Sequence, residues 1–152
     1  MSDIPQKNQP VPSAVADYFR ASPANYEFLL NNLGEAVVSL DPDRRIVTWN
    51  KAAERMYGWK AEEVKGRRIM DVISMTYPPG WDAQSMHRAL VEKGTWEGDI
   101  TQTTKDGRIL SVHTIRSLMR DEDGNIVGMN GINVDVTEQK KVEAAESAVF
   151  CV

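Results

Sequence analysis

Two Asp-Gly turns constrain the fold of this sequence more than any other feature. The turns, at 105–107 and 121–124, separate three runs with strand-like alternation, 96–103, 108–119 and 125–135. Asp-Gly pairs supply the positive φ angles that tight hairpins require. Because a tight turn sends each strand back along the one before it, the last third of the chain predicts a three-stranded antiparallel meander.

A second pair of strands is predicted nearer the N-terminus. Residues 36–40 and 45–49 alternate as strands do, and they flank a turn at 41–44 with proline in its second position. This pattern is typical of an antiparallel hairpin. Two strands, a middle of short helices and three further strands together predict an α+β fold with one five-stranded antiparallel sheet.

Capping residues place the helices between the two groups of strands. Asn50 can cap a helix that ends at Gly58, and Asp82 can cap one that ends at Gly94. A short helix is expected between these two. Residues 67–81 show no clean period, so the sequence predicts no regular element there.

The N-terminal part of the chain predicts a leader followed by helices. Residues 1–13 contain three prolines among Gln, Asn and Ser, and we expect them to be disordered. Residues 14–22 are expected to form an amphipathic cap helix, with Val15, Tyr18 and Phe19 on one apolar stripe. That stripe needs a partner to cover it.

Composition and charge argue against nucleic-acid partners, membrane partners and disulfides. The chain has 152 residues, 22 acidic and 18 basic, with no run of Lys or Arg longer than two, so we expect no nucleic-acid partner. No apolar stretch has the length of a membrane span or an export signal, so we expect no membrane partner. Cys151 is the only cysteine, which excludes an internal disulfide and favours the reducing cytoplasm. Its own role stays open.

Several motifs, in order and spacing, resemble those of a known family. Residues 50–59 are similar to the segment N-x-A-x-x-x-x-x-G-[YW], and residues 62–66 to E-E-[LV]-x-G. The turns at 105–107 and 121–124 match the family's paired turns, and residues 135–141 resemble its closing D-[IV]-T-E-x-K. Together these segments resemble a PAS domain with its C-terminal PAC motif.

The resemblance implies a sheet of strand order 2-1-5-4-3, with short helices on one face that enclose a ligand-sized cavity. It assigns residues 24–136 to the PAS domain and 137–152 to an outgoing linker helix and tail. The family implies sensing or dimerisation, usually attached to an effector module such as a histidine kinase or a cyclic-di-GMP enzyme, in cis or in trans. The sequence contains no such module, so standalone sensor, adaptor and N-terminal fragment all stay open, with the fragment favoured.

The resemblance leaves the cofactor unknown but keeps flavin open. Flavin-binding relatives known as LOV domains use a cysteine that residues 66–71 lack, which excludes a cysteinyl adduct. Gln102 and Asn133 match two of the three positions at which flavin-binding members meet the ring edge, and Val112 takes the third. We also assign Met56 and Trp96 to the ligand site, although Met56 is expected on the buried side of its helix and a tryptophan is more commonly a core residue.

The sequence does not favour haem binding, metal binding or catalysis. His87 lies more than a helical turn too early for the haem-binding pattern, and so on a different face of its helix, which disfavours haem. His113 is expected on a strand, packed or facing solvent. No cluster of His, Cys and carboxylates has the spacing of a metal site, and we find no nucleophile with a positioned base. The chain is therefore not expected to be an enzyme.

The fifth strand predicts how a signal leaves. Alternation places Asn133 on the inner face and Ile132 and Val134 on the outer face, where an apolar surface needs a cover. We expect the stripe of the 14–22 helix to supply that cover, in the same chain or from a second copy, and therefore a homodimer. Asp135 is expected to cap the outgoing helix, with Glu138 closing a capping box.

The sequence thus predicts a sensory domain that binds a small ligand or cofactor. A change at the ligand would pass along the fifth strand to Asp135 and Thr137 and into the outgoing helix. The alternative is a ligand-free module whose activity is dimerisation or protein interaction. An absorption spectrum distinguishes a coloured cofactor from the other cases.

Overall fold

The computed structural model describes residues 34–150 of the chain. The leader predicted at 1–13, the helix predicted at 14–22 and the helix expected before Gly34 lie outside the described residues. No helix in the described part combines the length and the apolar character that crossing a membrane requires.

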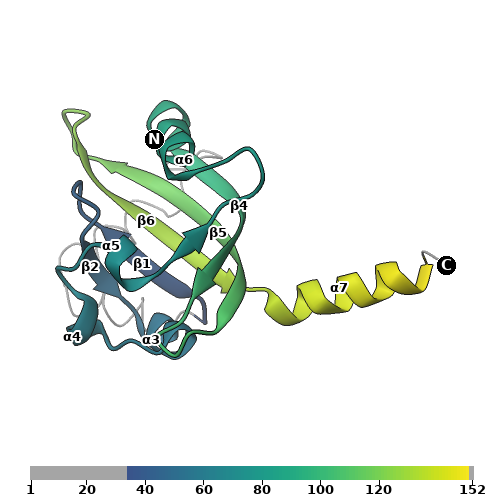
Figure 1. Ribbon diagram of the computed structural model, residues 1–152. Helices are drawn as coiled ribbons and strands as arrows, with labels where there is room; N and C mark the ends of the chain where they lie inside the picture. The colour runs from purple at the N-terminus through teal and green to yellow at the C-terminus, as the bar shows by residue number, and fades with distance from the viewer. Residues whose placement is uncertain (1–33, 151–152) are drawn as a thin grey trace, which may run out of the picture.

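One antiparallel sheet of six strands forms the body of the domain, in the order β2-β1-β6-β5-β4-β3 (Figure 1). The strands are β1 (Ala36–Leu40), β2 (Ile46–Trp49), β3 (Met75–Thr76), β4 (Thr95–Thr103), β5 (Ile109–Arg120) and β6 (Ile126–Asp135). Without β3, this order is the predicted one, 2-1-5-4-3. The α+β fold and its central antiparallel sheet are therefore confirmed.

The sixth strand and one helix lie in the stretch that showed no period. Here the chain forms the short helix α5 (Ile69–Val72) and then β3, which adds to the free edge of β4 through the pair Met75 and Gln102. Elements of four and two residues are too short to display a period. The predicted count of five strands was therefore one too low.

The predicted caps form as hydrogen bonds. The Asn50 side chain accepts from the Ala53 N–H at 2.9 Å, at the start of α3 (Lys51–Tyr57), and from the Val37 N–H at 3.0 Å. One side chain thus caps the helix and ties it to β1. Gly58 ends α3 at a φ of 80°, a conformation that glycine adopts without a steric cost. The four-residue helix α4 (Ala61–Val64) follows.

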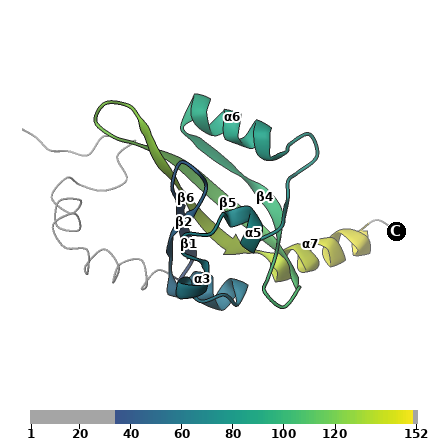
Figure 2. The same ribbon diagram turned by 60° about the vertical axis from the view of Figure 1, so that its left-hand side comes forward.

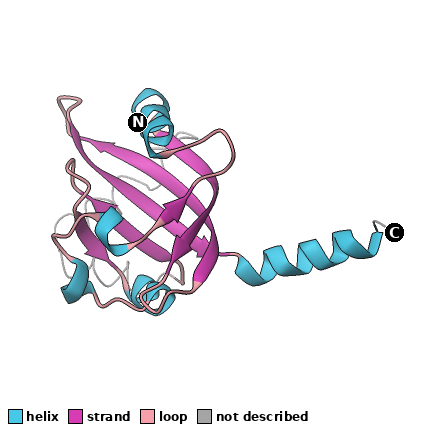
Figure 3. Cartoon of the chain, in the orientation of Figure 1, coloured by secondary structure: helices cyan, strands magenta, loops and turns pink. Residues whose placement is uncertain are grey.

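The helix α6 (Ala83–Lys93) covers the other end of the sheet (Figures 1 and 3). Asp82 accepts from the Ser85 N–H at 2.8 Å, and the Ser85 hydroxyl accepts from the Asp82 N–H at 2.9 Å. This helix buries its apolar stripe against β4 and β5. The resulting cluster consists of Met86, Ala89, Leu90, Trp96, Ile100, Leu110 and Val112.

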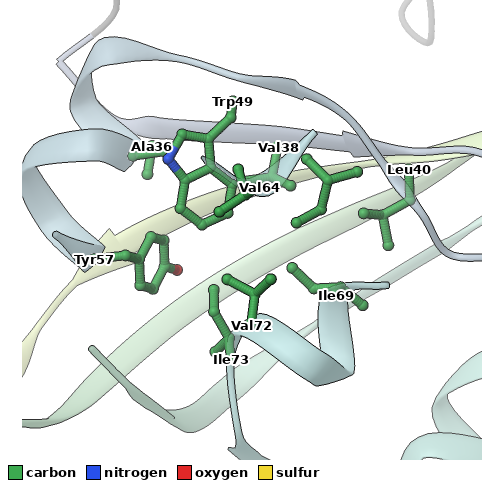
Figure 4. Packing of buried hydrophobic residues seen from close by; sticks show 11 residues of the cluster. Ala36, Val38, Leu40, Trp49, Tyr57, Val64, Ile69, Val72 and Ile73 are labelled. Carbon is green, nitrogen blue, oxygen red and sulfur yellow. The ribbon is translucent and has the colours of Figure 1, made fainter. Parts of the chain in front are cut away.

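A second apolar cluster lies under α3, α4 and α5, and Figure 4 shows its side chains. The rings of Trp49 and Tyr57 pack at a tilt of 44° with centroids 5.3 Å apart, beside Val38 of β1 and Ile73 after α5. Partly buried Met75 and Met129 contact both clusters. The two clusters thus meet at methionine side chains, which adapt easily to their surroundings.

The last helix, α7 (Thr137–Phe150), leaves the sheet at the end of β6 and extends away from the domain (Figures 1 and 2). Its residues from 138 to 147 are exposed. An exposed helix with weak amphipathic character gains little from packing in this arrangement.

Candidate functional site

A cavity of about 50 Å³ lies between the sheet and the helices α5 and α6. A buried water needs roughly 10 to 15 Å³, so the cavity admits more than single waters. Its apolar lining includes residues from both clusters: Val38, Leu40, Ile69, Ile73, Met86 and Met129. Its polar lining comes from strands, helix and loops: Arg44, Tyr77, His87, Gln102, Arg116 and Asn133.

Strand register brings the polar lining residues of β5 and β6 together. Arg116 of β5 pairs with Gly131 of β6, and Gly131 pairs on its other side with Val38 of β1. Asn133 lies two residues further along β6, and side chains two apart on a strand share a face. Arg116 and Asn133 are therefore diagonal neighbours on the cavity face of the sheet.

Tyr57 and Gln102 form a fully buried polar pair. The Tyr57 hydroxyl donates to Gln102 Oε1, and the two residues are 0 and 1% exposed. Burial raises the pKa of the Tyr57 hydroxyl well above its ordinary value, because the site disfavours the charged phenolate. Tyr57 thus acts as a neutral donor that fixes the Gln102 amide.

Arg116 is the one charged residue of the described sheet with its side chain buried on the cavity face. It is 6% exposed, and its guanidinium donates to the Tyr77 hydroxyl at 2.9 Å and to Met75 Sδ at 3.4 Å. The group also lies over the rings of Tyr77 and Trp96, at 5.5 and 5.7 Å from their centroids. Aromatic faces stabilise a cation but do not neutralise it.

The opposite face of the sheet carries a charged cluster of Glu97, Asp99, His113 and Lys140. His113 Nδ1 lies 2.7 Å from Asp99 and Nε2 lies 2.8 Å from Glu97. Lys140 of α7 pairs with the other Asp99 oxygen at 2.8 Å. Hydrogen bonds to Asp99 and then Glu97 raise the pKa of His113, and those to Lys140 and then His113 lower the pKa of Asp99. This cluster connects β4 and β5 to the outgoing helix.

The raised pKa of His113 predicts a pH dependence of stability. A group whose pKa is higher in the folded state stabilises it fully below the ordinary value, 6.5, and loses this effect as the pH rises through the folded value. We expect the free energy of unfolding, measured in urea, to fall as the pH rises above about 6.5 and through the raised pKa of His113. His113→Gln should flatten this slope. Equal slopes in the wild type and His113→Gln would contradict the assignment.

The junction of β6 and α7 is tied to β5. The Val136 N–H donates to the Ser111 carbonyl at 2.8 Å, and the Ser111 N–H donates to Thr137 Oγ1 at 2.9 Å. The Thr137 N–H donates to Asp135 Oδ1 at 3.0 Å. The first backbone bond of α7 runs from the Lys140 N–H to the Val136 carbonyl. A shift of β6 relative to β5 would therefore act directly on the start of α7.

This junction corrects the predicted capping box. Asp135 does accept a backbone N–H at the helix start, but α7 begins at Thr137, so Asp135 lies one residue before the N-cap position. No hydrogen bond of the described residues joins Glu138 to Asp135. The reason is the bonding of Val136 and Thr137 to Ser111, which prolongs the strand pairing beyond Asp135.

The structure separates the residues that were assigned to ligand binding. Gln102 and Asn133 line the cavity, whereas Met56 and Trp96 are not among its lining residues and pack in the core. His87 does line the cavity, although its spacing predicted a different face of the helix.

Ile132 and Val134 lie on the outer face of the sheet, as predicted. The helix that was expected to cover this face is not tested by the structure. Ile132 pairs with Ile115 and Val134 pairs with His113, on the face opposite the cavity. Ile115 is 38% exposed. The stripe of Val15, Tyr18 and Phe19, which was expected to cover this face, lies outside the described residues.

Sequence reasoning missed Arg116 and Tyr77. Alternation along β5 from Leu110 and Val112 would have placed Arg116 on the inner face, which was the available signal. Tyr77 lies in the stretch without a period, so nothing in the sequence indicated its position. The chemistry of the cavity depends on both residues.

The two amides that the resemblance matches to a flavin ring edge differ in their hydrogen bonding. Gln102 Oε1 accepts the Tyr57 hydroxyl, whereas Asn133 Oδ1 is buried without a partner among the described residues. Val112, at the third position, offers no polar group. Within the same residues, no group of three His, Cys, Asp or Glu is placed to hold a metal ion.

Comparisons with known proteins agree with this geometry. The sequence model of the family described as PAS fold matches residues 24–135. The probable diguanylate cyclase DgcE of Escherichia coli is 30% identical over 114 residues, which cover 74% of this chain and 10% of that protein. This chain spans 10 to 18% of the length of the curated relatives that it matches.

Solved structures share the same arrangement of strands and helices. The crystal structure of a PAS domain from Colwellia psychrerythraea superimposes with a TM-score of 0.65 at 27% identity, covering 76% of this chain and 98% of that one. The LOV domain of a blue-light activated histidine kinase from Erythrobacter litoralis gives 0.60 at 23% identity, with coverage of 70% and 99%. The second likeness concerns the fold alone.

Proposed function

The chain belongs to the PAS family, and from this membership we propose that it is the sensory domain of a signal-transduction protein. A small ligand binds in the cavity between the sheet and helices α5 and α6. Its presence changes β6, and the change leaves the domain through α7. The sequence similarity to a probable diguanylate cyclase and to a methanogenesis regulatory histidine kinase supports an effector module of one of these kinds as the recipient, in cis or in trans.

One observation carries this proposal: a single short strand segment contacts both the cavity and the outgoing helix. Asn133 lines the cavity, and Asp135, two residues later, bonds the first residue of α7. The distance between input and output is therefore a few residues of β6. A ligand shifts such an equilibrium only by its different affinities for the two states, typically about 1 to 3 kcal/mol.

An NMR screen tests the binding step. The ¹⁵N-labelled chain is mixed with a library of small anionic, neutral and cationic compounds, with the amides of Gly131 and Asn133 as reporters of the cavity. We expect at least one compound to cause saturable shifts there and also at Thr137 and Lys140. If no compound of any charge moves the cavity amides, and freshly purified protein carries no ligand by mass spectrometry, the sensory proposal is wrong and the ligand-free interaction module stands.

Asp135→Ala tests the relay. Loss of the carboxylate removes the acceptor of the Thr137 N–H, which should cost about 0.5 to 2 kcal/mol at the start of α7. We expect faster amide exchange at Lys140 and smaller ligand-induced shifts in α7, with unchanged shifts at Gly131. Asp43→Ala, at an exposed carboxylate of the β1–β2 turn, is the control. A full response of α7 in Asp135→Ala would exclude this relay.

A second copy of the chain is the proposed partner of the outer sheet face. Ile115, Ile132 and Val134 form an apolar patch on this face beside the charged cluster, and the predicted 14–22 helix offers a matching stripe. We expect sedimentation velocity to show a dimer at micromolar concentrations. Ile132→Lys should weaken the dimer and Thr101→Lys, on the same face near its edge, should not. A wild-type monomer at all concentrations would contradict this arrangement.

A further inference from the structure

The cavity is lined by two arginines, one histidine and no carboxylate. Arg44, His87 and Arg116 line it, and none of the described lining residues is Asp or Glu. This bias runs against the composition of the chain, which has 22 acidic and 18 basic residues. A cavity whose lining contains arginines and no carboxylate, in a protein with a net negative charge, favours the binding of anions over cations.

Arg116 lacks a counter-charge within the described residues. Its hydrogen bonds go to the Tyr77 hydroxyl at 2.9 Å, to Met75 Sδ at 3.4 Å and to Thr114 Oγ1 at 3.4 Å, all neutral groups. No ion pair joins it to a carboxylate of residues 34–150. A guanidinium has five N–H donors and keeps its charge in proteins, so donors remain as well as charge.

A buried charge without a partner is costly, and arginine buried in proteins ordinarily meets a carboxylate or phosphate. Here the apolar surroundings increase the strength of any ion pair that does form. An anion that enters the cavity would supply the missing counter-charge. Carboxylate groups match the planar fork of a guanidinium with two parallel hydrogen bonds.

The same cavity also contains a buried polar atom without a hydrogen-bond partner. Asn133 Oδ1 is buried and accepts no hydrogen bond from the described residues. Gly131 lies between the Arg116 and Asn133 positions on this face, and a Cβ there would be 3.9 Å from Asn133 Oδ1. Its missing side chain leaves room for a ligand to reach both groups. The ligand therefore carries a hydrogen-bond donor besides its charge.

The rest of the lining is apolar and adaptable. Four methionines line the cavity, and methionine side chains adjust to ligands of different shape: Met70, Met75, Met86 and Met129. Met70 is 48% exposed, and Arg44 and His87 are only partly buried, so these residues mark the mouth. The guanidinium of Arg44 at the mouth favours the entry of an anion.

We infer that the cavity takes a small organic carboxylate with an apolar body and a hydroxyl or N–H donor. Its carboxylate binds Arg116, its donor binds Asn133 Oδ1, and its body contacts the methionines. This inference rests on the proposed ligand-binding function and adds the chemical class of the ligand.

A matched series of six-carbon probes tests the charge. Hexanoate, hexanamide and hexylamine are titrated into the ¹⁵N-labelled chain, with the Gly131 and Asn133 amides as reporters. We expect hexanoate to bind about 10-fold or more tightly than either other probe, as a charge-assisted hydrogen bond predicts. 2-Hydroxyhexanoate, which adds a donor, should bind more tightly still. Equal binding of hexanamide or hexylamine overturns the carboxylate assignment and leaves the sensory proposal intact.

Variants of Arg116 test whether this residue binds the carboxylate. Arg116→Gln should weaken hexanoate by about 10-fold or more, Arg116→Lys should keep part of the affinity, and the exposed control Arg108→Gln should keep all of it. If Arg116→Gln binds hexanoate as well as the wild type does, Arg116 is not the anion site. If Arg116→Gln does not fold, the probe series on the wild type and Arg116→Lys decides. Absence of hexanoate binding to the wild type also overturns the inference, and the compound screen then decides separately whether the cavity binds any ligand.

Discussion

Replacing Arg116 with methionine should stabilise the ligand-free protein while removing its preference for carboxylates. Methionine is similar in length and would pack beside Met75, Tyr77 and Trp96 without a buried charge. The variant loses the hydrogen bond to Tyr77 but also the desolvation cost of the guanidinium. We expect the free energy of unfolding in urea to rise by about 1 to 2 kcal/mol, as when buried charges give way to apolar residues of similar volume.

A comparison of Arg116→Met with a matched control, Arg108→Met, separates a functional role of Arg116 from a structural one. Arg108→Met, at an exposed arginine, should change stability by less than about 0.5 kcal/mol. A site kept for binding commonly lowers the stability of the free protein, so a more stable but non-binding Arg116→Met fits a ligand role. Destabilisation by more than about 2 kcal/mol would instead indicate that the hydrogen bonds of Arg116 to Tyr77, Met75 and Thr114 hold the fold.

Gly128→Ala should be the most destabilising single substitution that we consider. A Cβ at this position of β6 would lie 2.3 Å from the Leu40 carbonyl oxygen of β1 and 2.9 Å from Met119 Cε of β5. The backbone oxygen cannot move without breaking the pairing of β1 with β6. Backbone strain of about 1 to 3 kcal/mol and overpacking of about 1 to 3 kcal/mol add to an expected loss of about 2 to 6 kcal/mol.

Gly124→Ala provides a matched control for this prediction. Gly124 also has a positive φ, 83°, but nothing lies within 4 Å of a Cβ there. Its loss should therefore be limited to the conformational term, about 1 kcal/mol. Urea unfolding of both variants measures the difference. Equal losses would show that β6 and β1 can separate at Gly128 at little cost, which contradicts a tightly coupled strand pair.

Much of the fold could be predicted because its signals are local. Asn50 and Asp82 cap helices through their own side chains, and the Asp-Gly turns determine where β4 and β5 end and where β5 and β6 begin. These preferences act over a few residues and do not depend on the rest of the chain. The segment 67–81 was different, because β3 and α5 exist only where β4 and the core provide contacts for them.

The site was predicted only in part, for a related reason. The family resemblance assigned Gln102 and Asn133 to the ligand site, alternation placed Asn133 on the inner face, and both residues line the cavity. Whether a polar group is free depends on its neighbours in space: Tyr57 occupies Gln102, and no described carboxylate meets Arg116. Such pairings join residues far apart in sequence, which no local pattern records.

The most direct test of the account is amide exchange at the start of α7 with the cavity empty and filled. NMR exchange rates of Val136 and Lys140, whose N–H groups bond Ser111 and Val136, are measured without probe and with saturating 2-hydroxyhexanoate. We predict that filling the cavity changes these rates by about fivefold or more, the lower end of measured couplings between sites. Unchanged rates at both amides, while Gly131 and Asn133 report a filled cavity, would contradict the claim that β6 carries the signal to α7.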